Sequence, residues 1–87
     1  MRESEVEKHL MWAVARQGGV TYKVKALGRP GFPDRVVILP GREIWLVELK
    51  TKGGRLSAVQ KRFAEEMKRL GAMYVCLWTT DQIDAWL

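Results

Sequence analysis

Asp34, Glu48 and Lys50 are of the types that bind a hard metal ion and act on a bound water molecule. Glu48 and Lys50 lie two residues apart in a run, 44–50, whose other residues are all apolar. Because side chains alternate along a strand, the carboxylate and the ammonium of this run would share one face. An ion in a half-buried strand costs several kcal/mol unless it is paired or binds a metal. The two side chains therefore either form an ion pair at the strand's end or belong to a site.

The turn between two predicted strands decides whether Asp34 joins them. An even loop at Pro40-Gly41 pairs Asp34 with Val47 and sends Glu48 to the opposite face. A three-residue loop, or a bulge at Gly41, pairs Asp34 with Glu48 and leaves their Cβ atoms roughly 5 Å apart. We expect the odd loop. Two carboxylates this close repel each other unless a cation lies between them, and Mg²⁺ or Mn²⁺ prefers such oxygen ligands.

The end of the same strand offers two further groups. The backbone carbonyl of Leu49 would supply another oxygen ligand. Lys50 would lie beside the metal, where its ammonium can orient or deprotonate an attacking water, or stabilise negative charge on phosphorus. Two acids, a metal and a lysine in one place predict metal-assisted phosphodiester hydrolysis.

The chain is basic, with 15 Lys and Arg against 10 Asp and Glu and a formal net charge of +5. This charge predicts a polyanionic partner, first of all nucleic acid; a basic surface that only maintains solubility is the alternative. The cations gather in two groups: Lys23, Lys25, Arg29 and Arg35, then Lys50, Lys52, Arg55, Lys61 and Arg62. Four of them are expected to contact the phosphate backbone: Lys23, Arg35, Lys52 and Arg55.

Length and composition exclude several classes of protein. The 87 residues, 47% apolar and 29% charged, indicate one globular domain over 1–87 and not a disordered or collagen-like chain. The longest apolar run, 72–78, is far shorter than the about 20 residues of a membrane span. The single cysteine, Cys76, excludes an internal disulfide and a multi-cysteine zinc site. Acidic residues within 3–5 argue against a secretory leader, so we expect a cytoplasmic location.

The elements that must position these residues follow from the apolar spacing and the glycine and proline breaks. Helical periodicity predicts helices at 3–17, 57–70 and 81–86, the last with Thr80 as its N-cap. Alternation and β-branched residues predict strands at 20–26, 34–39, 43–50 and 72–78. The last two strands flank a helix, which makes a parallel βαβ unit. The sequence therefore predicts an α/β fold of order α-β-β-β-α-β-α, a mixed sheet with helices on both faces.

The residues around the acidic pair resemble a known nuclease family. Gly31-Phe32-Pro33-Asp34 followed by Glu48-Leu49-Lys50 matches the PD-(D/E)xK signature. Flanking residues resemble the VRR-NUC branch of that superfamily over nearly the whole chain: Arg35, Thr51, Gly54-Arg55-Leu56-Ser57, Gln60 and Leu70-Gly71. The resemblance implies a restriction-endonuclease-like fold that hydrolyses DNA with Mg²⁺ or Mn²⁺. It also implies a stand-alone domain of the phage and bacterial type, which would act in the cytoplasm of a bacterial or phage-infected cell.

The resemblance assigns a role to each residue of the predicted site. It makes Asp34 and Glu48 metal ligands and Lys50 the catalytic lysine. Glu3 matches the family's first-helix acid and would be a further metal ligand. Glu7, one turn along the helix, is the alternative for that position. An ordinary first-turn acid, favourable against the helix dipole, is a third interpretation of Glu3.

A glutamine near the active lysine is also implied by the resemblance, and Gln60 occupies the matching position on the predicted second helix. It would support the catalytic group from there. Ser57 and Gln60 also have the spacing of a capping box, in which Gln60 would satisfy the backbone N–H of Ser57. The two roles are compatible.

The expected assembly is a homodimer on branched DNA. Some members of the family are similar to Holliday-junction resolvases, which implies dimers that cut Holliday junctions or flaps. Cutting both strands of a symmetric junction needs two sites, which a two-fold dimer supplies. Trp12 and Trp86 could be buried at a subunit interface. A non-catalytic DNA-binding module, or a subunit of a DNA-processing complex, is the alternative function.

Overall fold

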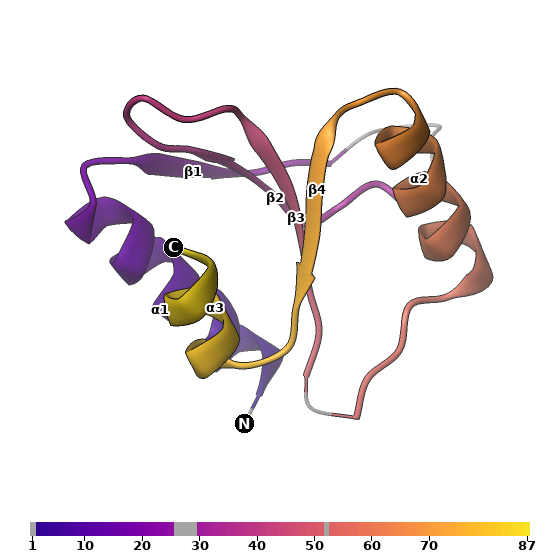
Figure 1. Cartoon of the computed structure of the whole chain (residues 1–87). Helices are drawn as coiled ribbons and strands as arrows, with labels where there is room; N and C mark the ends of the chain where they lie inside the picture. The colour runs from indigo at the N-terminus through magenta and orange to yellow at the C-terminus, as the bar shows by residue number, and fades with distance from the viewer. Residues whose placement is uncertain (1, 26–29, 52) are drawn as a thin grey trace.

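The helices and strands follow the predicted order over residues 2–25, 30–51 and 53–87, which the computed structural model describes (Figure 1). They are α1 (Glu3–Arg16), β1 (Val20–Lys23), β2 (Arg35–Ile38), β3 (Trp45–Leu49), α2 (Ala58–Arg69), β4 (Met73–Leu77) and α3 (Thr80–Trp86). All four strands are shorter than predicted. Residue 26, the last of the first predicted strand, lies outside the described residues.

The strands form one mixed sheet, as the sequence predicts, and lie in it in the order β1-β2-β3-β4. The β1–β2 and β2–β3 pairs are antiparallel, and β3 and β4 are parallel and joined through α2. The carboxyl ends of β3 and β4 therefore meet at one edge of the sheet. The beginning of α1 lies at this same edge (Figure 1). Side chains that follow β3 and those of the first turns of α1 are thus brought together.

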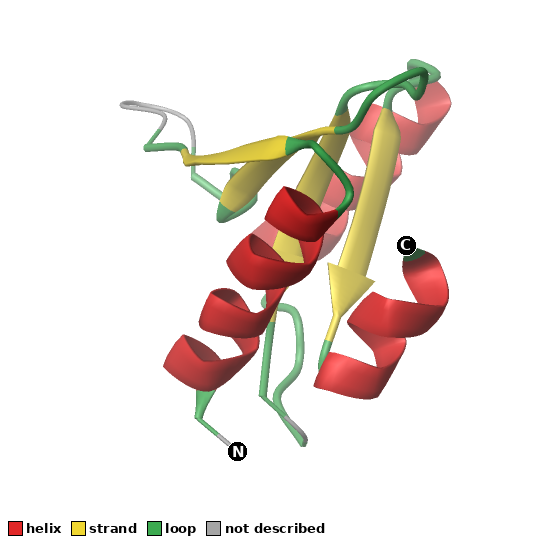
Figure 2. Cartoon of the chain, turned by 90° about the vertical axis from the view of Figure 1, so that its left-hand side faces the viewer, coloured by secondary structure: helices red, strands yellow, loops and turns green. Residues whose placement is uncertain are grey.

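Helices cover both faces of the sheet: α1 and α3 lie on one face and α2 on the other (Figure 2). The α1 side holds the core, because Val6, Leu10, Ala13 and Val14 recur at helical spacing and all face the sheet. They pack with buried residues of the sheet, of α3 and of the position that follows β2, namely Val37, Leu39, Val47, Leu49, Leu77 and Ile83. This packing fixes the rotation of α1 and, with it, the direction of its polar side chains. No helix in the described residues is long and apolar enough to cross a membrane.

The α1–α3 face also accounts for two residues singled out in the sequence. His9 Nε2 lies 2.7 Å from Asp84 Oδ1 and ties α1 to α3. Trp86 packs edge to face on Trp45, with ring centroids 5.4 Å apart, and lies against the core. Trp12, by contrast, is 56% exposed. Of the two tryptophans considered for a subunit interface, Trp12 is the one left largely on the surface.

The capping residues match the sequence at α2 and differ from it at α3. Ser57 caps α2: its Oγ accepts from Gln60 N at 3.1 Å, and Ser57 N donates to Gln60 Oε1 at 2.8 Å. The predicted N-cap of α3, Thr80, is wrong. Thr79 is extended, and its Oγ1 accepts from Gln82 N, whereas Thr80 is already helical. An N-cap residue needs a non-helical backbone, and the two adjacent threonines do not reveal which of them has it.

The β2–β3 turn has the predicted odd loop. The register pairs Arg35 with Val47 and Val37 with Trp45. Continued by one residue, it places Asp34 opposite Glu48. Gly41 in the loop has φ +67°, a left-handed conformation that glycine adopts without the penalty a side chain would add. The loop is therefore what brings the two acids together.

Candidate active site

Glu48 is a buried acid near the end of the central strand β3. It is 2% exposed, and its Oε1 has no hydrogen-bond partner in the described part of the chain. Burial, followed by a hydrogen bond to Asp34 and the charge of that carboxylate, raises the pKa of Glu48 to about 8. The charge of Lys50 lowers this pKa and that of Glu3 raises it further. Glu48 thus keeps a proton at neutral pH that an exposed glutamate would lose.

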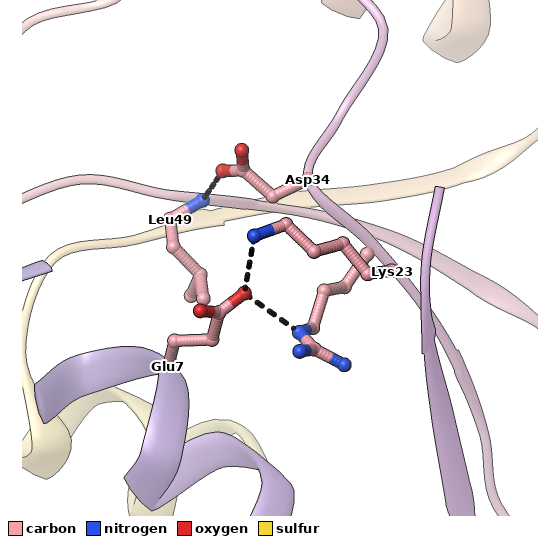
Figure 3. Close-up of polar contacts among 5 residues, drawn as sticks. Glu7, Lys23, Asp34 and Leu49 are labelled. Carbon is pink, nitrogen blue, oxygen red and sulfur yellow. Dashed lines mark hydrogen bonds and ion pairs between the residues drawn. The ribbon is translucent and has the colours of Figure 1, made fainter. Parts of the chain in front are cut away.

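Asp34 is held at the end of β3 by the backbone. Its Oδ2 accepts a hydrogen bond from Leu49 N at 2.8 Å (Figure 3). β2 begins only at Arg35, so Leu49 N donates to the side chain of Asp34 in place of a further backbone hydrogen bond between β2 and β3. The carboxylate is therefore fixed against the strand that carries Glu48, and the two acids approach each other as the odd loop predicts.

Lys50 follows β3 directly and is half-buried. Its backbone N–H donates to Leu77 O at 3.0 Å, which continues the parallel ladder by one bond. Its ammonium makes no ion pair with Glu48 among the described residues: the pairs there join His9 to Asp84 and Glu7 to Lys23 and Arg35. The strand-end ion pair between Glu48 and Lys50, the alternative to a site, is not formed.

A pocket of about 230 Å³ opens beside these residues. It is lined by Glu3, Ser4, Glu7, Lys23, Asp34 and Leu49. These residues come from the first turns of α1, the end of β1, the approach to β2 and the end of β3. The pocket therefore gathers carboxylates from two elements and an ammonium from a third at the carboxyl end of β3.

Comparison with known proteins points to one family. A phage protein named "Putative nuclease p44", from Acyrthosiphon pisum secondary endosymbiont phage 1, is 38% identical over 81 residues, or 93% of this chain and 87% of the relative. A solved structure described as a VRR_NUC domain superposes with a TM-score of 0.89 at 32% identity, covering 95% of this chain and 90% of the other. No family model matches the sequence. The chain belongs to the VRR-NUC family. Its α/β fold is the restriction-endonuclease-like fold of that family.

Glu3 and Glu7 are the two candidates for the first-helix acid of the VRR-NUC family in this chain. Glu7 Oε2 lies 2.9 Å from Arg35 Nε and 3.9 Å from Lys23 Nζ, so this carboxylate is already paired (Figure 3). Glu3 lines the same pocket, and its charge raises the pKa of Glu48. Of these two acids, Glu3 is the one whose charge acts on the buried carboxyl.

The residues expected to contact phosphate are not all on the surface. Lys23 is 71% exposed at its side chain, and Arg55 is exposed as well. Arg35 is different: its side chain is 9% exposed and ion-paired with Glu7. A guanidinium buried against the core is not available to a DNA backbone, because β2 directs it toward α1. Lys52 lies outside the described residues.

Gln60 is placed by the capping box. Its side-chain oxygen accepts from Ser57 N, the contact already described for the start of α2. The capping role predicted for it is confirmed. No hydrogen bond joins the Gln60 side chain to Lys50 within the described chain.

Two features of the site were missed in the sequence. The Glu7–Arg35 ion pair spans 28 residues, and its only local signal is an arginine in a β-branched run. Cys76 lies beside Glu48 on the neighbouring strand. Burial, and then the charge of Glu48, raises the pKa of the Cys76 thiol to about 11. The parallel register predicts such a neighbour only when the alignment of both strands is known.

Proposed function

We propose that this protein is a divalent-metal-dependent DNA endonuclease. The observation that carries the proposal is the meeting of two carboxyls, Asp34 and Glu48, at the end of a central strand. Glu48 Oε1 is buried and lacks a hydrogen-bond partner in the described chain, and its raised pKa reflects an unfavourable place for a lone negative charge. A divalent cation would satisfy the oxygen and offset the charge, so the residues present fit such an ion.

Asp34, Glu48 and the backbone carbonyl of Leu49 are the proposed direct ligands of Mg²⁺ or Mn²⁺; Glu3, expected from the sequence as a further ligand, does not group with both of these carboxyls among the described residues. The described residues contain no cluster of three or more His, Cys, Asp or Glu side chains that could hold a metal. A backbone oxygen is therefore part of the proposed set. Leu49 N donates toward Asp34, and the carbonyl of a strand residue points to the same side as its N–H.

Lys50 is the proposed catalytic lysine. A bound divalent cation would lower the pKa of a ligated water and offset the charge of the phosphate. The Lys50 ammonium lies near Glu48, as its effect on that pKa indicates, and has no ion-pair partner in the described residues that would neutralise it. It would orient the attacking water and stabilise the negative charge that develops on phosphorus.

Gln60 is proposed as a supporting residue beside this lysine. Its oxygen is engaged by Ser57 N, so its amide nitrogen is the group left to reach the site. A supporting role of this kind is separable from capping, since Ser57→Ala breaks the same box without touching the Gln60 amide.

The proposed substrate is branched DNA, such as Holliday junctions or flaps. The net charge of +5 and the exposed Lys23 and Arg55 support a phosphate-rich partner, and Lys52 is retained as a further contact. A homodimer would present two sites to a symmetric junction. The single domain over 1–87 would act in the cytoplasm of a bacterial or phage-infected cell.

The test is cleavage of labelled four-way junction, flap and linear duplex DNA in Mg²⁺, Mn²⁺ or EDTA. Wild type is compared with Lys50→Ala and with Lys68→Ala, which removes the same charge from an exposed position of α2. We expect metal-dependent cuts that vanish in Lys50→Ala and persist in Lys68→Ala. The cut pattern would then identify the preferred DNA structure.

Two further measurements complete the test. Mn²⁺ should bind wild type and lose most of its affinity in Asp34→Ala, and sedimentation should give the mass of a dimer. DNA binding without cleavage in every metal would refute the endonuclease and leave the non-catalytic DNA-binding module or the subunit of a larger complex. A monomer mass at micromolar protein would refute the dimer alone.

A further inference from the structure

Arg35 is a buried cation whose charge is balanced by Glu7 of α1. Its side chain is 9% exposed in the middle strands of the sheet, and its Nε lies 2.9 Å from Glu7 Oε2. Removing one partner of such a pair leaves an uncompensated charge in a place that water cannot reach. The ion pair with Arg35 therefore holds the Glu7 carboxylate in one position, because the buried guanidinium needs a partner.

Lys23 shares this carboxylate from the neighbouring strand. The β1–β2 register pairs Lys23 with Arg35, so the two cations lie side by side on one face of the sheet. Like charges placed directly opposite each other on adjacent strands are destabilising. Glu7 lies between them and contacts both, at 2.9 Å from Arg35 Nε and 3.9 Å from Lys23 Nζ (Figure 3).

The three charges do not cancel. Glu7 is neutralised by the buried Arg35, which leaves the charge of Lys23 uncompensated. The Lys23 side chain is 71% exposed and lines the pocket that Asp34 and Leu49 also line. Glu7 thus orients the ammonium at the rim of an otherwise acidic pocket without removing its positive charge.

We propose that Arg35, Glu7 and Lys23 form a phosphate-binding subsite, in which Glu7 is the positioning residue and Lys23 contacts a non-bridging phosphate oxygen of the bound nucleic acid. The ligand is a phosphodiester next to the one at the metal site, because Lys23 borders the same pocket as Asp34. Arg35 serves from the interior and touches no phosphate. The inference rests on the proposed function for its substrate class, and on the observed contacts for its geometry.

The first experiment measures the salt dependence of DNA binding in EDTA, where no cleavage occurs. A labelled four-way junction is the probe, and the affinity is followed from about 50 to about 200 mM salt. Each phosphate contact adds about 0.9 to the slope of log affinity against log salt, so its loss weakens the salt effect over this range by about 3.5-fold. We expect this decrease for Lys23→Ala and none for Lys68→Ala. Equal slopes for Lys23→Ala and Lys68→Ala would overturn the subsite.

The second experiment tests the role of Glu7 by a double-mutant cycle. Glu7→Gln keeps an oxygen that Arg35 can donate to, and it releases Lys23 from its ion pair. If Glu7 acts through Lys23, Glu7→Gln lowers DNA affinity in wild type and has no further effect in Lys23→Ala. Additive losses would overturn the positioning role. Lys23→Ala alone keeps the subsite testable even when Glu7→Gln folds poorly, because Lys23 is exposed.

Both arms use binding and not turnover, so they separate this inference from the proposed function. A changed salt slope in a protein that never cleaves DNA would support the subsite and refute the endonuclease. Cleavage that depends on Lys50, together with an unchanged slope in Lys23→Ala, would support the endonuclease and refute the subsite.

Discussion

Glu48→Gln should change how the folding stability of this protein depends on pH. The folded protein holds the Glu48 proton up to a pKa of about 8, against an ordinary value of 4.5. Between these two values the folded state binds one more proton than the unfolded chain. The free energy of unfolding therefore decreases as the pH rises through this window, and the contribution of Glu48 is fully present only below the unfolded value.

The size of the effect follows from the shift. One bound proton corresponds to about 1.4 kcal/mol of unfolding free energy per pH unit. From about pH 5.5 to about pH 7.5, wild type should lose about 2.5 kcal/mol through this one group, because the folded protein has already released part of the proton near pH 7.5. Such a loss is a large part of the stability of a small domain. Glu48→Gln carries no ionisable group there, so its curve should lack this slope.

The assay is urea unfolding, followed by tryptophan fluorescence in EDTA at several pH values within this window. The difference between wild type and Glu48→Gln isolates Glu48, because every other side chain is the same in both proteins. Mn²⁺ should flatten the wild-type curve, since a cation that binds the ionised carboxylate replaces the proton. Parallel curves for the two proteins in EDTA would refute the reasoning, because Glu48 would then have the same pKa folded and unfolded.

Three further predictions follow from the packing around the site. Ser57→Ala and Gln60→Ala should each lower the unfolding free energy by about 1 kcal/mol, because each breaks the capping box. Gln60→Ala should also lower the cleavage rate more than Ser57→Ala does, and equal rates would contradict the proposed supporting role of Gln60. Leu10→Ala should cost about 2–5 kcal/mol in urea unfolding, since this fully buried side chain seats α1 on the sheet, and a smaller cost would argue against that packing. Gly31→Ala should lower the melting temperature, because φ at Gly31 is +86° and a Cβ would lie 2.8 Å from Val59 O; an unchanged value would refute this contact.

Much of the fold could be predicted from local pattern alone. The helical spacing of Val6, Leu10 and Ala13 predicts α1 and its buried face, and the Ser57-to-Gln60 spacing predicts the start of α2. The strands were predicted too long at their ends. These ends depend on where the neighbouring strand stops, and that is not a property of the strand's own residues.

The candidate site was predictable where it depends on one strand or one turn. Glu48 and Lys50 share a face because side chains alternate, and the odd loop through Gly41 gives Asp34 the register that meets Glu48. Arg35 was assigned to the DNA surface, and the structure buries it. An arginine is usually exposed to solvent, but β2 directs the Arg35 side chain toward α1, where it pairs with Glu7.

The sequence by itself determined which groups could share a face, because the periods of helix and strand are set by the geometry of the chain within a few residues. Only the tertiary structure decided which faces meet. Glu7 and Arg35 lie 28 residues apart and touch because α1 is seated on the sheet by its core residues. Burial within the sheet raises the pKa of Glu48. The strand register and the packing of α1 on the sheet depend on many contacts between residues far apart in the sequence, so no short segment determines them.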